Sequence, residues 1–277
     1  YGDRDHAASS ASGSGFDQTV RTRAVYLQDD LTLGRHRVLL AARHSHHDAF
    51  GDHLTWDAEY GYRLDDHTRL SAAVGTAFRA PDATDRFGFG GDPNLKPETS
   101  RNIELGLHHQ LNNNQSLALS AFDNRIKNLI EYDLATSKLM NIGRARIRGI
   151  EASYDIQTRP WGAHIEAIAQ DPRDEVSGEP LARRAKRTLT ASLFYDAGRY
   201  RVGVDWLATG QRKDSPFSTT YDAGYALLNL TAQARLTPQW TLQGRVENLT
   251  DKKYTLADGY NTAERSLNVE LRYGYKI

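Results

Sequence analysis

The sequence FRAPDATDRFGFGGDPNLKPETSRNIELG, residues 78–106, contains a polar loop rich in proline and glycine between two segments with a strict two-residue period. Before the loop, apolar residues alternate with small or polar ones from Leu70 to Phe78, and after it they alternate from Ile103 to Leu111. A period of two predicts a β-strand with one apolar and one polar face. This stretch therefore predicts two long strands joined by a large loop.

Composition limits what such strands can build. The chain has 277 residues, a formal net charge of zero and no cysteine, so disulfides, thiolate metal sites and cysteine nucleophiles are excluded, and no basic surface points to nucleic acid. No run of eighteen apolar residues is present, which excludes a transmembrane helix. The mean hydropathy of −0.64 is still compatible with a membrane barrel, whose strands need apolar residues only at alternate positions. The N-terminal residues lack the features of a signal peptide.

The same alternation recurs along the chain and predicts about thirteen strands with no competing helix. Short and long connections between these strands take turns. The short ones are predicted at 33–36, 65–67, 112–114, 158–162, 196–199 and 237–239, and the long ones at 46–52, 80–99, 132–140, 172–183, 211–223 and 255–263. Outer-membrane barrels separate short periplasmic turns from long extracellular loops in this way, and aromatic residues near strand ends suit their interfacial girdles. A soluble sandwich or propeller could also use those aromatic residues in its core. The pattern favours an all-β, antiparallel, up-and-down transmembrane β-barrel.

Three ordered motifs resemble a signature of TonB-dependent outer-membrane receptors. They are the FRAP…NLKPE…S-x-x-x-E-x-G stretch, NIGRARIRGIEASY at 141–154 and RVENLTDKKYTLADGYN at 245–261. Within that family, PLARRAKRTL at 180–189 followed by DKKY and DGYNTAER resembles cobalamin receptors. The resemblance implies an N-terminal plug domain inside a barrel of about 22 strands.

The chain departs from that family pattern at its N-terminal side, where no plug domain and no TonB-binding box is visible. Strand parity predicts that residues 1–18 form a polar extracellular loop or linker and that residues 19–277 form the C-terminal part of the receptor barrel. If this portion stands alone, we expect an open or gapped sheet, because an unpaired strand edge in lipid is costly.

The resemblance implies energy-coupled uptake of a scarce nutrient across the bacterial outer membrane. Cobalamin is the first candidate ligand, and a ferric siderophore or haem is the alternative. The implied partners are the lipid bilayer, lipopolysaccharide, the nutrient itself and the TonB complex, the last through the plug. A passive, porin-like structural barrel is a further hypothesis. An enzyme is disfavoured because no G-x-S-x-G, H-E-x-x-H or P-loop motif is present, although rim residues such as His46, Asp48 and Asp82 could be cast as a hydrolase site.

Candidate ligand-binding residues lie in the long loops. Arg183, where the loop 172–182 re-enters a strand, can contact polar groups of a ligand in the mouth, but it can equally be a lumen charge or a partner for lipopolysaccharide phosphates. The resemblance to cobalamin receptors implies ligand contact by Arg183, by Tyr260 in DGYN and by Phe217 in DSPFSTTY. An aromatic ring such as that of Tyr260 binds large planar ligands by stacking, and its alternative role is in an interfacial girdle.

No metal or cofactor site is predicted. Histidines and aspartates in the HSHHD region suggest a metal cluster at first, but a solvated loop explains them as well. These residues are His44, His46, His47, His53, Asp48 and Asp52. Asp82, Asp85 and Asp92 have no fixed calcium-ligand spacing, and turn chemistry accounts for them.

Overall fold

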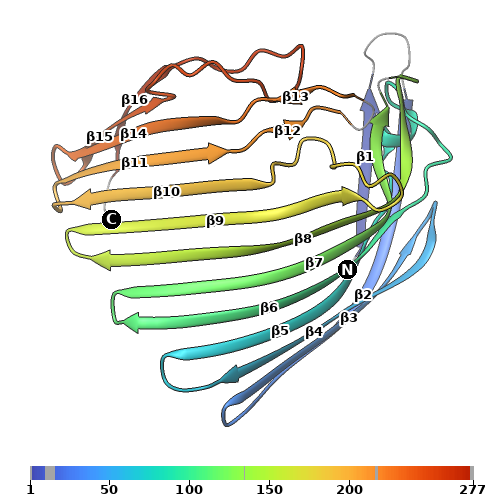
Figure 1. Cartoon of the computed structure of the whole chain (residues 1–277), viewed down its shortest axis with the longest axis horizontal. Helices are drawn as coiled ribbons and strands as arrows, with labels where there is room; N and C mark the ends of the chain where they lie inside the picture. The colour runs from blue at the N-terminus through green and yellow to red at the C-terminus, as the bar shows by residue number, and fades with distance from the viewer. Residues whose placement is uncertain (1, 10–15, 134, 216–217, 275–277) are drawn as a thin grey trace.

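The computed structural model describes residues 2–9, 16–133, 135–215 and 218–274. These residues form one strongly curved sheet of fourteen antiparallel strands (Figure 1). The strands are β1 (Gly2–Ser9), β2 (Phe16–Leu33), β3 (His36–His47), β4 (Gly51–Arg63), β5 (Thr68–Arg79), β6 (Glu98–Asn112), β7 (Gln115–Asp133), β8 (Lys138–Thr158), β9 (Trp161–Asp174), β10 (Arg187–Asp196), β11 (Tyr200–Thr209), β14 (Tyr225–Arg235), β15 (Trp240–Glu247) and β16 (Ser266–Tyr273).

Every strand of the sheet pairs with the strands that precede and follow it in that order, which is an up-and-down meander. Tight hairpin turns lie at one end of the sheet and the longest connections at the other, on the left and right of Figure 1. We call the second end the outer end. The predicted fold class is confirmed, with fourteen strands in the sheet where about thirteen were expected. None of the helices in the described ranges is long and apolar enough to cross a membrane.

The sheet has two chemically different faces because its register aligns apolar residues from strand to strand. Leu107 of β6 pairs with Leu70 of β5 and with Leu119 of β7, and the same row continues through Ala152 and Ala167. We call this side the apolar face. The opposite, polar face carries small and polar residues between these positions. Since alternate residues of a strand point to opposite sides, the apolar face is the lipid face of a barrel wall and the polar face lines its lumen.

The structure differs from the sequence-based expectation in three places. Residues 1–18 were predicted to be a loop, whereas β1 occupies Gly2–Ser9 and pairs along its length with the start of β2. The loops expected at 46–52 and 132–140 are hairpins, because β3 pairs with β4 as far as His47 and β7 pairs with β8 as far as Asp133. Polar side chains do not prevent two strands from pairing, because the pairing is made by backbone groups. These strands therefore continue through segments whose polar residues had predicted a loop.

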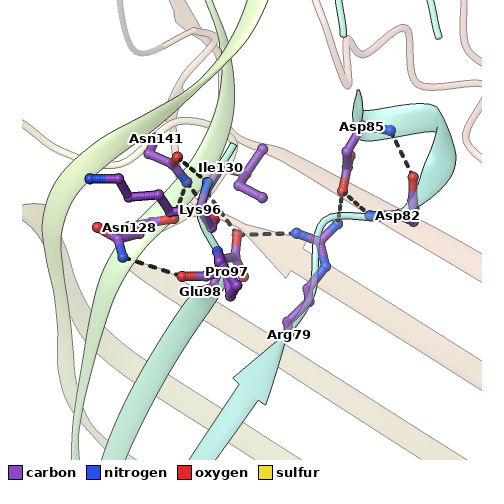
Figure 2. Close-up of polar contacts among 9 residues, drawn as sticks. All are labelled: Arg79, Asp82, Asp85, Lys96, Pro97, Glu98, Asn128, Ile130 and Asn141. Carbon is purple, nitrogen blue, oxygen red and sulfur yellow. Dashed lines mark hydrogen bonds and ion pairs between the residues drawn. The ribbon is translucent and has the colours of Figure 1, made fainter. Parts of the chain in front are cut away.

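The loop between β5 and β6 is folded around two short polar networks (Figure 2). Its helix α1 (Ala83–Phe87) begins with a capping box, in which the Asp85 N–H donates to Asp82 Oδ1 at 2.7 Å and the Asp82 N–H donates to Asp85 Oδ2 at 3.1 Å. Arg79 then joins the two ends of the loop, donating to Asp85 Oδ2 at 2.8 Å and to Glu98 Oε1 at 3.1 Å. The FRAP and KPE motifs thus meet through one guanidinium group.

The second network fastens the loop to β7 and β8. The Ile130 N–H donates to Glu98 Oε1 at 2.8 Å, and Asn128 Nδ2 donates to the Pro97 carbonyl at 3.3 Å. Asn128 has a φ of 58°, and the β7–β8 pairing skips both Asn128 and Gly143 of β8 while its register stays the same on either side. The ladder is therefore interrupted here without a bulge. Beyond the interruption, Leu129 is buried with Ala145 and Leu181 in a small apolar cluster. Ile126 and Ile147 of the same cluster belong to the polar-face register, so the cluster lies on the lumenal side.

Candidate ligand-binding site at the outer end

Three of the long connections at the outer end fold against one another: 175–186, 210–224 and 248–265. The Arg183 N–H donates to the Lys213 carbonyl at 2.7 Å, and Arg183 Nε donates to the Asp214 carbonyl at 3.2 Å. Asp214 in turn accepts a hydrogen bond from the Asp258 N–H at Oδ1, at 2.9 Å. The segment 212–215 is therefore the centre to which the other two connections attach.

Burial of Leu181 places the 175–186 connection over the lumenal face. The Leu181 side chain is 2% exposed and packs against Leu129 and Ala145, while its N–H donates to the Pro172 carbonyl at 3.0 Å. Two residues later, Arg183 adopts a φ of 56°, in the left-handed region that residues other than glycine rarely occupy. This turn directs the chain toward Lys213 and sets the position of the guanidinium group.

The 210–224 connection contains a two-stranded ribbon whose charged side chains are buried. Strand β12 (Arg212–Lys213) pairs with β13 (Tyr221–Asp222). Arg212 Nη2 donates to the Thr255 carbonyl at 2.7 Å, and its Nε lies 3.7 Å from Asp222 Oδ2. Lys213 Nζ donates to Glu179 Oε2 at 3.2 Å. Because unpaired buried charges are costly, these contacts couple the ribbon to both neighbouring connections.

In the 248–265 connection, Asn248 organises the motif that follows it. Its Oδ1 accepts from the Lys252 N–H at 2.8 Å, its Nδ2 donates to the Lys252 carbonyl at 3.0 Å, and its own N–H donates to Asn229 Oδ1 at 2.9 Å. Asp251 Oδ1 accepts from the Arg265 N–H at 3.0 Å, closing the connection near β16. Asn248 is 4% exposed with a φ of 49°, and its side-chain amide holds the backbone of this connection in place.

Together with the end of β7, these connections enclose a cavity of about 910 Å³. It is lined by Glu131, Tyr132, Ala182, Arg183, Asp214, Ser215, Tyr254, Leu256, Ala257, Asp258, Tyr260, Asn261, Thr262 and Ala263. We call it the outer cavity. Tyr260 is 75% exposed at its edge, and the rings of Tyr254 and Tyr225 contact each other with centroids 4.5 Å apart. Its size falls within the range of small-molecule sites.

The charges around the outer cavity are mixed. Arg183 is its cationic group, and the acidic side chains on its wall are Glu131, Asp214 and Asp258. Burial raises the pKa of Glu131, an effect that the nearby Arg184 opposes. The wall therefore offers hydrogen-bond donors and acceptors together with aromatic faces, without a strong net positive potential.

The structure places two of the three sequence-predicted residues, Arg183 and Tyr260, on this one cavity. Phe217 lies outside the described residues. Sequence reasoning missed Glu131 and Tyr132, which lie on β7 some 50 residues before Arg183 in the chain. The only signal for them was their position next to the NIG motif, with which their strand pairs.

The histidine region is strand rather than loop. His46 Nδ1 lies 2.9 Å from Asp52 Oδ1, and His44 Nε2 lies 3.6 Å from the same oxygen. Over the described ranges, no group of three or more His, Cys, Asp or Glu side chains is placed to hold a metal ion. Asp82 caps α1, and Asp92 Oδ1 accepts from the Asn94 N–H at 2.8 Å. Both carboxylates therefore bind nearby backbone N–H groups.

Residues 1–249 match a family model described as TonB dependent receptor-like, beta-barrel. Among solved structures, the siderophore receptor PirA from Acinetobacter baumannii is 19% identical with a TM-score of 0.79, over 99% of this chain and 51% of that one. A mutant of the ferric enterobactin receptor PfeA from Pseudomonas aeruginosa is 18% identical with a TM-score of 0.77, over 96% and 46%. The copper transporter OprC is 17% identical with a TM-score of 0.77, over 93% and 48%. The chain thus spans about half the length of these proteins, and at such identities the likeness concerns the fold.

Proposed function

Since the chain belongs to the TonB-dependent receptor β-barrel family, we propose that it forms the C-terminal part of the barrel wall of a receptor for energy-coupled nutrient uptake. Its place is the bacterial outer membrane, with the apolar face toward lipid. In this proposal the long connections at the outer end capture the nutrient. Transport then depends on a plug domain and the TonB complex, which belong to the rest of the receptor.

We propose that the outer cavity is part of the ligand site. The observation that carries this is the convergence of Arg183 and Tyr260 on one cavity of about 910 Å³, from connections that lie far apart in the sequence. A binding site needs aromatic surface and a few oriented polar groups, and this cavity has both. The polar wall faces the lumen, as a ligand entering the barrel requires.

Cobalamin is the first candidate ligand, because the chemistry of the outer cavity suits a large, amide-rich molecule of low net charge. Such a molecule can accept hydrogen bonds from Arg183 and donate to Glu131 or Asp258, with ring contact on Tyr260. A polyanionic ferric siderophore would meet those two carboxylates as like charges. The fold likeness to siderophore receptors does not choose between the two ligands, so a ferric siderophore or haem is the alternative.

The test is ligand binding by the complete receptor, with cobalamin, haem and ferric siderophores as probes. Arg183→Ala should weaken cobalamin binding roughly tenfold or more, because a hydrogen bond to a charged donor contributes about 1.5–3 kcal/mol. Tyr260→Ala should weaken it roughly fivefold, because aromatic contact contributes about 1 kcal/mol. Asn268→Ala, on the lumenal side of β16 away from the outer cavity, is the matched control and should leave binding unchanged.

Three outcomes distinguish a wrong ligand assignment from a wrong receptor class. If both variants keep cobalamin affinity within about twofold of wild type, the cobalamin assignment is wrong. Binding of a siderophore or haem that depends on the same two residues would then identify the ligand. A complete receptor that binds none of the three probes would favour a passive barrel.

A further inference from the structure

A row of four arginines crosses the apolar face just above its apolar band. The register pairs Arg101 of β6 with Arg125 of β7, Arg125 with Arg146 of β8, and Arg146 with Arg173 of β9. These positions continue the register of the apolar face, so the side chains belong to its outer-end border. Like charges directly opposite each other on neighbouring strands repel, which makes such a row unfavourable without an anion.

The residues around this row are also mostly cationic. Lys127 and Arg144 pair one step further out, and Arg148 lies one step closer to the apolar band. Nine cationic side chains and three acidic ones make up this surface, which we call the basic belt. Its members are Arg101, Arg125, Lys127, Arg144, Arg146, Arg148, Arg173, Lys186, Arg187, Asp123, Asp171 and Glu175.

The acidic members form ion pairs with only some of the cationic side chains of the basic belt. Arg146 Nη2 donates to Asp123 Oδ2 at 2.5 Å, and Arg173 Nε donates to Asp171 Oδ2 at 2.8 Å. Among the described residues, Arg101 and Arg144 have no carboxylate within ion-pair distance. Arg125 and Arg148 are paired only at 3.7 and 3.6 Å, and their side chains are 59% and 60% exposed. Several guanidinium groups are thus available to an external anion.

Directly beneath the basic belt, the apolar face is hollowed. A groove of about 900 Å³ runs across β6 to β11, where alanines stand between larger side chains. Its apolar-face lining includes Leu105, Leu107, Leu119, Ala121, Ile150, Ala152, Ala167, Ala169, Leu189 and Ala208, and Arg187 of the basic belt also lines it. An apolar groove that ends at a cationic surface is complementary to a lipid molecule, whose apolar acyl chains end at an anionic headgroup.

We propose that the basic belt and this groove together bind one outer-leaflet lipid with a phosphate-bearing headgroup. Guanidinium forks match phosphate geometry, and Arg101 and Arg173 stand roughly 14 Å apart, three inter-strand spacings of about 4.8 Å. That width accommodates a headgroup with more than one phosphate, and one acyl chain lies in the alanine groove. Bound phosphates remove the repulsion within the arginine row. The lumenal nutrient site is on the opposite face, so the two proposals stand independently.

The experiment measures lipid retained by the complete receptor after extraction in mild detergent, by native mass spectrometry. Arg101→Gln/Arg125→Gln/Arg173→Gln should reduce the retained phosphorylated lipid at least fivefold. The matched control, Arg63→Gln/Arg69→Gln/Arg235→Gln, removes three arginines away from the basic belt, near the short-turn end of the strands, and should retain wild-type levels. Added back, the same lipid without its phosphates should fail to bind wild-type receptor.

A second variant tests the groove separately. Ala152→Phe/Ala167→Phe fills the groove at lipid-exposed positions of β8 and β9, with the basic belt intact, and should also lower retention severalfold. Retention at wild-type levels in both the glutamine and the phenylalanine variants would overturn the proposal. So would equal binding of the dephosphorylated lipid, or displacement of the lipid by millimolar inorganic phosphate alone, which would reduce the site to simple ion binding. Retention of an acidic protein in place of lipid would identify a different occupant and overturn it too.

Discussion

Asn141 and Lys96, 45 residues apart, are joined by a reciprocal pair of hydrogen bonds: the Lys96 N–H donates to Asn141 Oδ1 at 2.8 Å, and Asn141 Nδ2 donates to the Lys96 carbonyl at 3.0 Å (Figure 2). The same Nδ2 also donates to the Asn128 carbonyl at 2.7 Å. One amide therefore closes the β5–β6 loop onto β8 and also holds β7 at Asn128, where the β7–β8 ladder is interrupted. The NLKPE and NIG motifs, which resemble a family signature in sequence, are therefore in direct contact through these hydrogen bonds.

Replacing this amide should loosen the β5–β6 loop. Asn141→Asp keeps the shape but loses both donations, and it places an anion beside the Lys96 and Asn128 carbonyls. We expect a loss of about 1–3 kcal/mol in the free energy of unfolding, because two hydrogen bonds of about 0.5–1.5 kcal/mol each are lost, one to an exposed and one to a half-buried carbonyl. Urea unfolding in detergent micelles measures it, and faster limited proteolysis within 80–97 should accompany it.

Asn113→Ala is the control for that substitution. Asn113 is an exposed residue of the short β6–β7 turn, and its side chain has no hydrogen bond among the described residues. It should change stability by less than about 0.5 kcal/mol. Equal unfolding curves for Asn141→Asp and wild type would show that the two motifs are not energetically coupled.

Arg79 offers a test of the other network in the same loop. Its side chain bridges Asp85 and Glu98, whose side chains are only 15% and 14% exposed. Arg79→Lys keeps the charge but presents one ammonium group, which cannot donate to both carboxylates with the same geometry. We expect about 1–2 kcal/mol of destabilisation for lysine and about 1–3 kcal/mol for Arg79→Ala.

A double-mutant cycle separates the two arms of this bridge. If Arg79 stabilises the loop through Asp85, then Asp85→Asn should cost little in the Arg79→Ala background. Additive losses, within about 0.5 kcal/mol, would mean that the two side chains act independently and that the bridge contributes nothing.

The sequence predicted the fold well because alternation is a local property. Strand positions, faces and the order of short and long connections all follow from a two-residue period. It failed at 46–52 and 132–140, where polar residues continue a ladder, since a strand past the membrane has no apolar face to mark it. The strand over Gly2–Ser9 was missed for the same reason.

The site was predictable only in part. Arg183 and Tyr260 were found through resemblance, whereas Glu131 joins them from the end of β7, beyond the interrupted pairing at Asn128. The positive φ of Asn128 is a property of the folded backbone, and the two-residue pattern of the sequence does not indicate it. The basic belt was also missed, because its arginine row exists only once four strands are in register.

Glu131 should make stability depend on pH. It lies beyond Asn128 at the outer end of β7, where it lines the outer cavity. Burial raises the pKa of Glu131 above its ordinary value of 4.5; Arg184 and Arg183 lower it, and Asp174 and Glu98 raise it. For a raised folded-state pKa, the stabilisation is complete below the unfolded value and is lost as pH rises through the folded value.

Glu131→Gln isolates this effect. The variant should match wild type at acidic pH, where the glutamate is protonated, and should become the more stable of the two as pH rises through the raised pKa. Unfolding curves recorded between about pH 4 and pH 8 measure the difference. A constant difference across that range would contradict the prediction, since it would mean that the Glu131 carboxyl does not titrate differently on folding.

The last prediction separates the side chain of Arg183 from its backbone conformation. At a φ of 56°, glycine adopts the turn without the strain of about 1–2 kcal/mol that other residues carry there. Arg183→Gly should therefore keep the hydrogen bond from its N–H to the Lys213 carbonyl and be more stable than Arg183→Ala by about 1 kcal/mol. Both variants lack the guanidinium group and should lose ligand affinity equally. If Arg183→Gly binds like wild type while Arg183→Ala does not, the loop conformation is what matters, and Arg183 is not a ligand contact.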